Sequence, residues 1–417
     1  MGGGLRKSKV LIIGGGIGGL VTALALKEEG FEVKVFESVK ELKPLGVGIN
    51  ILPHCVRVLT KLGLVNQISE RAVETSDLVY FNRLGQQFWA EPRGKFAGNK
   101  WPQFSVHRGT LQMLLYEATL AKIGSENLIM NHHFSHFEQN EEEVTAFFKD
   151  KTTGELIHQE RGDILIGADG INSMVRQQLY PHEGPPVYSE NVLYRGTTVM
   201  KGFLNETSMA MIGSLKQKMV VYPIENRDAR GNQLINWVAN LKEGKSSLTD
   251  RDWNREADKS KLLALYHNWR FDWLDVYAMI EQSEKVFEFP MSDRNPLEQW
   301  TFGRVTLLGD AAHPMYPIGS NGASQAIIDA DVLRGYLVAN TDLKEALNLY
   351  DAERRPATAK VVLQNRAKGP DEIMDLMEDA FPDGFTEDQI PHDMLEAIMD
   401  NYKKVAGFDI KTLNAMG

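Results

Sequence analysis

The sequence predicts an α/β fold in which a Rossmann-like dinucleotide-binding domain carries an inserted antiparallel β-sheet and is followed by C-terminal helices. Three observations predict it. Apolar runs followed by glycine-containing loops recur at residues 8–19, 163–170 and 304–310, as expected of parallel strands in a nucleotide-binding sheet. Residues 192–241 contain strand-like segments at close spacing. Residues 357–417 are acidic, contain methionines and have a helical pattern.

A βαβ unit is predicted over residues 8–37. Residues 8–13 (SKVLII) form an apolar run rich in β-branched side chains, which favours a buried parallel strand. Residues 17–29 place apolar side chains at helical spacing and are followed by Gly30, a residue typical of helix C-termini. Residues 32–37 alternate and predict the second strand.

The same criteria assign the other segments. Helices are expected at residues 50–72 with a break at Gly63, and at 108–122, 251–283 and 321–339. Strands are expected at 76–89 around a turn, in a hairpin over 127–149, and at 163–167, 192–200, 207–212, 218–224, 233–241 and 304–308. This order predicts a discontinuous cofactor domain (1–75, 101–183 and 300–356), an inserted substrate domain (76–100 and 184–299) and a C-terminal helical segment (357–417).

Composition excludes several function classes. The 417 residues are 43% hydrophobic and 24% charged, which allows a sizeable core. The formal net charge of -10, without a basic cluster, argues against nucleic-acid binding. No apolar run is long enough to span a membrane, and Cys55 is the only cysteine, so we expect a cytoplasmic protein without an internal disulfide. His132, His133 and His136 share a predicted strand whose neighbouring residues face opposite sides, so no metal site is expected.

The first motif is a glycine-rich turn between the first strand and the first helix. Gly14, Gly16 and Gly19 follow the G-x-G-x-x-G spacing: the first permits a tight turn, the second lets the backbone approach a pyrophosphate, and the third allows close helix–strand packing. The helix starting at Ile17 offers free N–H groups to the phosphates. Glu37 ends the next strand, where its carboxylate can accept hydrogen bonds from a ribose diol.

Three further segments carry weaker signals. Arg108 and Gln112 share one helix face, where they can reach a phosphate and a ribose or backbone carbonyl; taken alone, the pair is more typical of a solvated surface. Asp169 and Gly170 follow a strand, and the Asp is equally suited to capping the next helix or to holding a cofactor through water. Asp310 follows the last predicted strand and can accept a hydrogen bond from a sugar hydroxyl.

Taken together, these segments resemble the FAD-dependent aromatic hydroxylases, the group A flavoprotein monooxygenases with a para-hydroxybenzoate-hydroxylase-type fold. The likeness covers residues 9–330 and extends through Asp351–Pro356; within the family it is greatest to the phenazine-modifying enzymes. The stretches that carry it, besides the motifs above, are Pro44–Asn50, Glu91–Gly94, Tyr222–Ile224 and Asn321–Ala326. One departure concerns the loop that faces the flavin ring, where Ser320 and Asn321 replace the family's usual Gly and Gln.

The resemblance implies which residues contact FAD. Glu37 would hold the adenosine ribose, and Arg108 and Asp310 the phosphate and ribityl portions. The full expected cofactor set is Gly14, Gly16, Ile17, Gly19, Glu37, Gly46, Val47, Gly48, Arg108, Gln112, Asp169, Gly170, Asp310, Gly322 and Ala323. Placement on the inserted sheet and the ring-facing loop gives the substrate-lining candidates Tyr222, Trp237, Met315, Tyr316 and Pro317. No catalytic acid or base is assigned.

The implied activity is hydroxylation of an aromatic or heteroaromatic small molecule, phenazine-like by the closest resemblance. FAD would be reduced by NADH or NADPH, and dioxygen would be used through a flavin hydroperoxide, in a monomer or homodimer. Two alternatives stay open from the residues: a flavin oxidase or reductase on the same scaffold, and a nicotinamide-dependent dehydrogenase without flavin.

Overall fold

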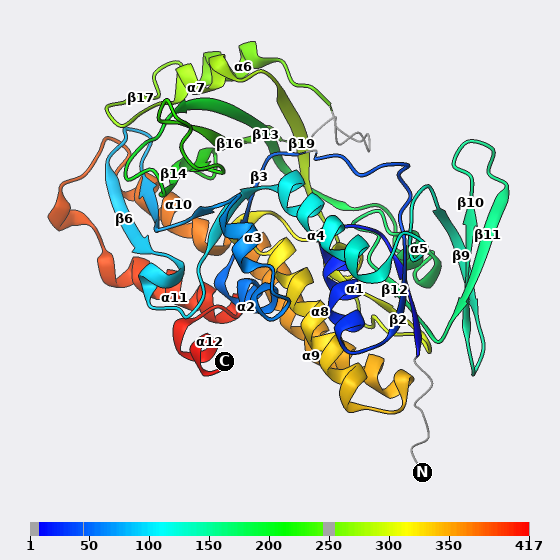
Figure 1. The fold of residues 1–417 in the computed structure, drawn as a ribbon. Helices are drawn as coiled ribbons and strands as arrows, with labels where there is room; N and C mark the ends of the chain where they lie inside the picture. Colours follow the sequence, from blue (N-terminus) through cyan, green and yellow to red (C-terminus); the bar gives the residue numbers. More distant parts are fainter. Residues whose placement is uncertain (1–7, 45, 245–254, 417) are drawn as a thin grey trace.

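A five-stranded parallel sheet forms the centre of the cofactor-binding region. The computed structural model describes residues 8–44, 46–244 and 255–416 (Figure 1). The strand order is β20 (Val305–Leu307), β12 (Ile164–Gly167), β1 (Lys9–Ile13), β2 (Glu32–Phe36) and β8 (Leu128–Ile129), and all neighbours are parallel. Their apolar side chains share one core with α1 (Ile17–Glu28), α4 (Arg108–Ile123) and α8 (Gly322–Ala339). The predicted βαβ unit is present with bounds that differ by one or two residues.

A small antiparallel sheet extends the predicted hairpin and packs into the same core. It contains β9 (His133–Gln139), β10 (Val144–Lys149) and β11 (Leu156–Gly162), of which β11 was not predicted. The rings of Phe36 and Phe148 are stacked with centroids 4.2 Å apart, which joins the two sheets. A second small sheet consists of β3 (Gly48–Ile51), β7 (Phe104–His107) and β4 (Val73–Glu74). The helices α2 (Pro53–Lys61) and α3 (Val65–Ser69) connect β3 to β4.

The inserted sheet has seven strands and is antiparallel except where β14 runs parallel to β5. Its order is β19 (Val286–Asp293), β13 (Val187–Lys201), β16 (Asn232–Lys242), β15 (Gln217–Pro223), β14 (Met209–Ser214), β5 (Asp77–Phe81) and β6 (Gln87–Pro92). Because strand residues alternate between faces, the sheet buries two separate apolar surfaces. One packs under α6 (Lys259–Leu265) and α7 (Val276–Gln282), and the other faces the C-terminal helices and the cavity described below (Figure 1).

The prediction of a helix over residues 251–283 is wrong in the middle of that range. Two short helices flank a small hairpin, β17 (Arg270–Phe271) and β18 (Leu274–Asp275), and residues 251–254 lie outside the described residues. The hairpin places Trp273 against Phe81 of the sheet, with ring centroids 4.2 Å apart. Asp258 and Asp275 cap the two helices by accepting hydrogen bonds from the amides of Ser260 and Ala278. Aromatic packing and a second cap therefore interrupt the helical pattern.

The C-terminal region is helical, as predicted. Its elements are α9 (Leu343–Arg366), α10 (Glu372–Ala380), α11 (His392–Ala406) and α12 (Ile410–Ala415). Helix α9 continues across the expected boundary at residue 356, and the division into three domains stays a prediction. Among the described residues, no helix is long and apolar enough to cross a membrane.

Candidate active site

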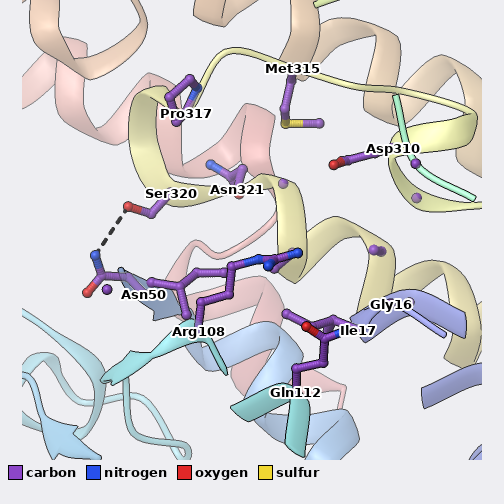
Figure 2. Close-up of a pocket in the computed structure, with 18 of the residues that line it drawn as sticks. Gly16, Ile17, Asn50, Arg108, Gln112, Asp310, Met315, Pro317, Ser320 and Asn321 are labelled. Carbon is purple, nitrogen blue, oxygen red and sulfur yellow. Dashed lines mark hydrogen bonds between the residues drawn. The ribbon is translucent and has the colours of Figure 1, made fainter. Parts of the chain in front are cut away.

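The four sequence motifs meet at the carboxyl ends of the parallel strands. Gly14 follows β1, Glu37 follows β2, Asp169 lies two residues beyond β12, and Asp310 lies three residues beyond β20. All four line one cavity of about 960 Å³, at the upper end of the usual size range for ligand sites. The cavity extends from these loops to the inserted sheet. Figure 2 shows the end of the cavity near the loops, with Gly16, Arg108 and Asp310. A crevice outside the carboxyl ends of parallel strands is where such folds bind ligands.

Two long helices point uncapped N-termini at this cavity. Gly16 and Asn321 are the N-cap residues of α1 and α8, and neither side chain caps its helix. The first N–H groups of each helix have no intrahelical acceptor and carry the positive end of the helix dipole. A Cβ atom added at Gly16 would meet no protein atom within 4 Å, so the backbone there is open to a ligand. The free N–H groups at these two helix N-termini can donate hydrogen bonds to an anion or to the carbonyl oxygens of a ring.

The glycines of the first motif have separate roles. A Cβ at Gly14 would lie 2.4 Å from the carbonyl oxygen of Ala168, and one at Gly19 would lie 2.1 Å from that of Gly14. These two glycines therefore let neighbouring loops and the first helix pack closely. The carboxylate of Glu37 accepts hydrogen bonds from the amides of Gly15 (2.7 Å) and Val39 (3.0 Å), which fixes it beside the motif. Glu37 also lines the cavity.

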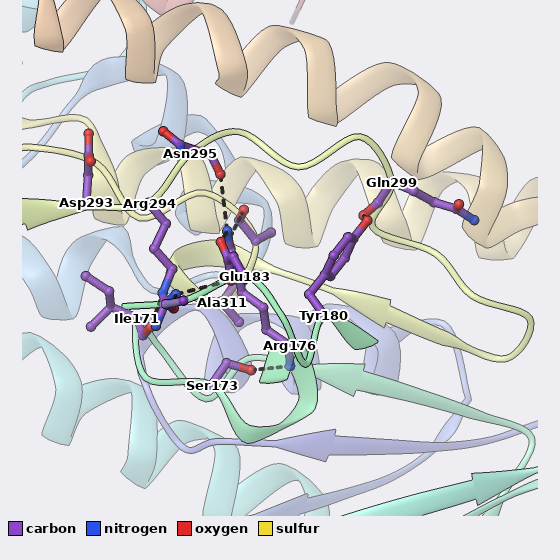
Figure 3. Close-up of polar contacts among 12 residues, drawn as sticks. Ile171, Ser173, Arg176, Tyr180, Glu183, Asp293, Arg294, Asn295, Gln299 and Ala311 are labelled. Atoms are coloured by element: carbon purple, nitrogen blue, oxygen red, sulfur yellow. Dashed lines mark hydrogen bonds and ion pairs between the residues drawn. The ribbon is translucent and has the colours of Figure 1, made fainter. Parts of the chain in front are cut away.

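Arg176 ties the third motif to the fourth (Figure 3). Its side chain is buried, and its guanidinium donates to the carbonyl oxygens of Ala311 and Ala312, both at 3.0 Å. It also donates to the carboxylate of Glu183 at 2.8 Å. Asp169 accepts from the amide of Met174 at 2.7 Å, so the capping interpretation of this residue holds while it also lines the cavity. The two loops are thus held in one fixed arrangement.

Asp329 of α8 holds the loop after β20 from the other side. This fully buried carboxylate accepts from the Gly309 amide (3.1 Å) and from the Arg354 guanidinium of α9 (2.7 Å). Its Oδ2 also lies 2.5 Å from Nε2 of His313. Burial raises the pKa of Asp329, but the charges and hydrogen bonds of His313 and Arg354 outweigh it and lower the pKa to about 2. His313 therefore helps to hold this loop in place through the buried carboxylate of Asp329.

The ring-facing loop has an unusual backbone conformation at two successive residues. Gly319 and Ser320 both have positive φ (67° and 57°), so Ser320 occupies the left-handed region that favours glycine. The Tyr402 hydroxyl of α11 accepts from the Asn321 side chain at 2.9 Å and lies 3.2 Å from the Ile318 carbonyl oxygen, to which it can donate. A Cβ at Gly319 would lie 2.0 Å from this hydroxyl. The C-terminal helices thus position the loop.

The inserted sheet forms the far wall of the cavity in regular rows. Tyr222 of β15 pairs with Asn236 of β16, and the Asn236 side chain accepts from the Gly48 amide at 2.6 Å, which brings this row against the cofactor region. The next row contains Arg195 and Val238, and the third contains Asn240 and Lys218. The methionines that line the cavity are Met174, Met209, Met211, Met291, Met315 and Met399. Flexible, polarizable side chains suit a large flat ligand.

Arg195 is the unusual member of this wall. Its Nε is buried without a hydrogen-bond partner, and no carboxylate lies within ion-pair distance of its guanidinium in the part of the chain that the structure describes. The Phe289 ring lies under the guanidinium at 6.0 Å. Burial lowers the pKa of Arg195 from its ordinary value, with a smaller opposing effect from Tyr222. An unpaired guanidinium facing an apolar cavity is a site for an anionic group.

Comparison with known proteins identifies the family. The FAD binding domain family matches residues 7–365. A phenazine 1,6-dicarboxylic acid hydroxylase from Lysobacter antibioticus is 39% identical over 86% of this chain and 89% of its own, and a 3-hydroxybenzoate 6-hydroxylase from Polaromonas naphthalenivorans is 30% identical over 86% and 87%. The chain belongs to the FAD-dependent aromatic hydroxylases.

Solved structures agree with the fold of this hydroxylase. A salicylate hydroxylase–substrate complex superimposes with a TM-score of 0.74 at 21% identity, covering 98% of this chain and 97% of the other. The complex of Klebsiella pneumoniae HpxO with FAD and uric acid gives 0.73 at 21% identity, covering 97% and 96%. The family match and the curated relatives show that the hydroxylase is a flavoprotein monooxygenase that acts on an aromatic small molecule, and that its cofactor is FAD. The alternative without flavin is excluded.

The cavity fits FAD in the expected orientation. Glu37 and the α1 N-terminus lie where a ribose and a pyrophosphate need them, and Arg108 and Asp310 have no ion-pair partner among the described side chains. Burial raises the pKa of Asp310. Gln112 donates to the Gly15 carbonyl at 3.1 Å, the backbone contact foreseen for it. Figure 2 shows Arg108, Ile17 and Asp310 around the same space. The residue assignments themselves stay predictions.

Several predicted contact residues do not line the cavity. Gly19 serves helix–strand packing, and Gly46 and Val47 lie behind Gly48, which does line it. The Val47 carbonyl accepts from the Arg108 amide at 2.9 Å, so this segment positions Arg108. The predicted lining residues Gly14, Gly16, Ile17, Glu37, Gly48, Arg108, Gln112, Asp169, Gly170, Asp310, Gly322 and Ala323 all reach the cavity.

Two of the five substrate-lining candidates need correction. Tyr222, Met315 and Pro317 line the cavity. Trp237 instead points to the opposite face of the sheet, where its Nε1 donates to Ser283 at 2.8 Å, because strand alternation sends its neighbours toward the cavity. Tyr316 packs with the C-terminal helices and does not line the cavity either.

Proposed function

We propose that this hydroxylase acts on a planar heteroaromatic acid of phenazine size, with NADH or NADPH as the electron donor. The observation that carries the proposal is the unpaired guanidinium of Arg195, which faces a methionine-lined cavity one row away from the cofactor region. A carboxylate there would replace the water that burial removes from the guanidinium. The printed names of the two curated relatives, a hydroxylase of a phenazine dicarboxylic acid and a hydroxylase of a hydroxybenzoate, support an aromatic acid as the substrate, although the first of these acids is a diacid.

The residues of the wall would bind and orient the ring while excluding water. Bound FAD would supply the oxygen-transfer chemistry, for which the protein contributes position and a dry environment. Tyr222 and Met209 lie in the row nearest Gly48, so they would contact the part of the ring closest to the flavin. Leu78 and Met211 would cover its faces. None of the described side chains is assigned as a proton donor or acceptor in the oxygen-transfer step.

A panel of aromatic acids tests this function. The FAD-loaded protein is mixed with NADH or NADPH and each acid, and the rate of nicotinamide oxidation is compared with the mass of the product. We expect phenazine-1-carboxylic acid to accelerate oxidation and to yield a product containing one added oxygen. Acceleration without any oxygenated product would favour a flavin oxidase or reductase, and no response to any aromatic acid would contradict the proposal.

Replacing Arg195 by glutamine should weaken binding of the acid by roughly 10- to 100-fold, the effect of removing a charge-assisted hydrogen-bond pair of about 1.5–3 kcal/mol. The measurement is equilibrium dialysis of phenazine-1-carboxylic acid against the FAD-loaded variant. The corresponding neutral carboxamide is the matched control, because its affinity should change far less. Equal losses for acid and amide would show that Arg195 only supports the wall.

The monomer or homodimer state and the cytoplasmic location stay predictions.

A further inference from the structure

A second cation, Lys218, belongs to the same wall of the cavity. It lies on β15, in the row beyond Arg195 and directly opposite Asn240. Both Lys218 and Asn240 are buried. Unlike Arg195, Lys218 has an acidic partner, because its ammonium forms an ion pair with Asp371. Asp371 is fully buried in η4 (Gly369–Asp371), just before α10, so the C-terminal segment supplies this charge.

The other cations at this end of the cavity are also neutralised. Arg93 pairs with Glu91 at 2.7 Å, and Lys403 of α11 pairs with the same carboxylate at 2.8 Å and with Asp400 at 3.2 Å. Arg195 is therefore the one cation of this end without a carboxylate partner among the described residues. The charges at the far end of the cavity therefore favour one anionic group, placed next to Arg195.

A second carboxylate on the same ring would meet the Lys218–Asp371 pair. Arg195 and Lys218 lie two strands and one row apart, which corresponds to about 12 Å between Cα atoms in a regular sheet. Their long side chains can bring the charges closer than that, within reach of opposite sides of a tricyclic ring. A carboxylate placed there would lose its hydration and face Asp371, a like charge, beside a lysine already paired.

The following inference rests on the proposed function. We propose that Asp371 is a specificity-determining residue, because of which the cavity binds planar aromatic monoanions more tightly than dianions. The carboxylate cancels the charge of Lys218 and repels a second acid group, so discrimination comes from an unfavourable contact with the wrong ligand. A buried ion pair contributes little net stability compared with an apolar replacement, which is consistent with a role in selection. Removing the Asp371 charge should turn Lys218 into a second anion site.

The test compares phenazine-1-carboxylic acid with phenazine-1,6-dicarboxylic acid by equilibrium dialysis against the FAD-loaded protein. We expect the wild type to bind the monoacid roughly tenfold or more tightly than the diacid. In Asp371→Asn, which keeps the side-chain shape, the ratio of the two dissociation constants should shift toward the diacid by about tenfold or more. The double variant Lys218→Met/Asp371→Asn has no charge at this position and should return to a preference for the monoacid.

A wild type that binds the diacid as tightly as the monoacid would overturn the proposal, as would an unchanged ratio in Asp371→Asn. If that variant does not fold, the wild-type ratio and the double variant still decide, since a double variant that binds the diacid as tightly as the monoacid would contradict the proposal. Failure here is separable from failure of the proposed function. Oxygenated product from the monoacid upholds the function whatever the ratio, and no binding of either acid contradicts both.

Discussion

Replacing Gly16 by valine should abolish FAD binding while the protein remains folded. The backbone at Gly16 has φ -76° and ψ 178°, which a valine can adopt, and an added Cβ would meet no protein atom within 4 Å. The side chain would instead fill the space in front of the α1 N-terminus, where the pyrophosphate is expected. We expect the FAD dissociation constant to rise by roughly 100-fold or more, equivalent to about 3 kcal/mol.

Gly335 provides the matched control, because a Cβ there also meets no protein atom, but the residue lies in the middle of α8 and does not line the cavity. Gly335→Val should keep FAD affinity within about threefold of the wild type, since valine is no worse a helix former than glycine. FAD fluorescence titration and thermal unfolding of the flavin-free protein measure both variants. Unchanged FAD binding in Gly16→Val would remove the first motif from the cofactor site.

Asp329→Asn should destabilise the protein by about 3–5 kcal/mol, the cost of leaving buried charged partners uncompensated. The carboxylate is fully buried between Arg354 and His313 and also accepts from the Gly309 amide. Its loss should loosen the loop that carries Asp310, so FAD affinity should fall together with the free energy of unfolding. Urea denaturation of the flavin-free variant and FAD titration measure the two effects.

The pH dependence of this effect has a definite sign. The pKa of Asp329 is lowered from 3.8 to about 2 in the folded protein, so the carboxylate contributes stability above about pH 4 and loses it as the pH falls toward 2. That shift corresponds to about 2 kcal/mol. The difference in the free energy of unfolding between wild type and Asp329→Asn should therefore shrink below pH 4.

Asp400→Asn, which removes an exposed carboxylate, is the control for Asp329→Asn. It should lower the free energy of unfolding by less than about 1 kcal/mol. Equal losses in the two variants would contradict the structural role of Asp329.

The cofactor region could be predicted from the sequence because its chemistry depends on short local patterns. Apolar strands followed by Gly14, Asp169 and Asp310 mark the carboxyl ends of parallel strands, and the structure brings them to one cavity. The departure at Ser320 was also visible in the sequence, and the structure places this residue at a positive φ of 57°, where glycine is favoured. Rules of backbone geometry and helix termini were sufficient to predict the residues around this part of the cavity.

The substrate wall could not be predicted in the same way. Which face of a strand meets the cavity depends on a register set by partners that are distant in sequence. Trp237 was therefore chosen, although Val238 and Asn240 are the residues of β16 that line the cavity. Arg195 belongs to no motif, and it is distinguished only by the absence of a nearby carboxylate among the residues that the structure describes. The Lys218–Asp371 pair joins residues 153 positions apart, beyond any local pattern.

The most direct test of the account is to supply ¹⁸O₂ to the FAD-loaded protein with NADH or NADPH and phenazine-1-carboxylic acid, and to analyse the product by mass spectrometry. The account predicts that one labelled oxygen atom appears in the ring product, the other leaving as water, with little hydrogen peroxide formed. An unlabelled product, or conversion of the consumed dioxygen entirely to hydrogen peroxide, would contradict it.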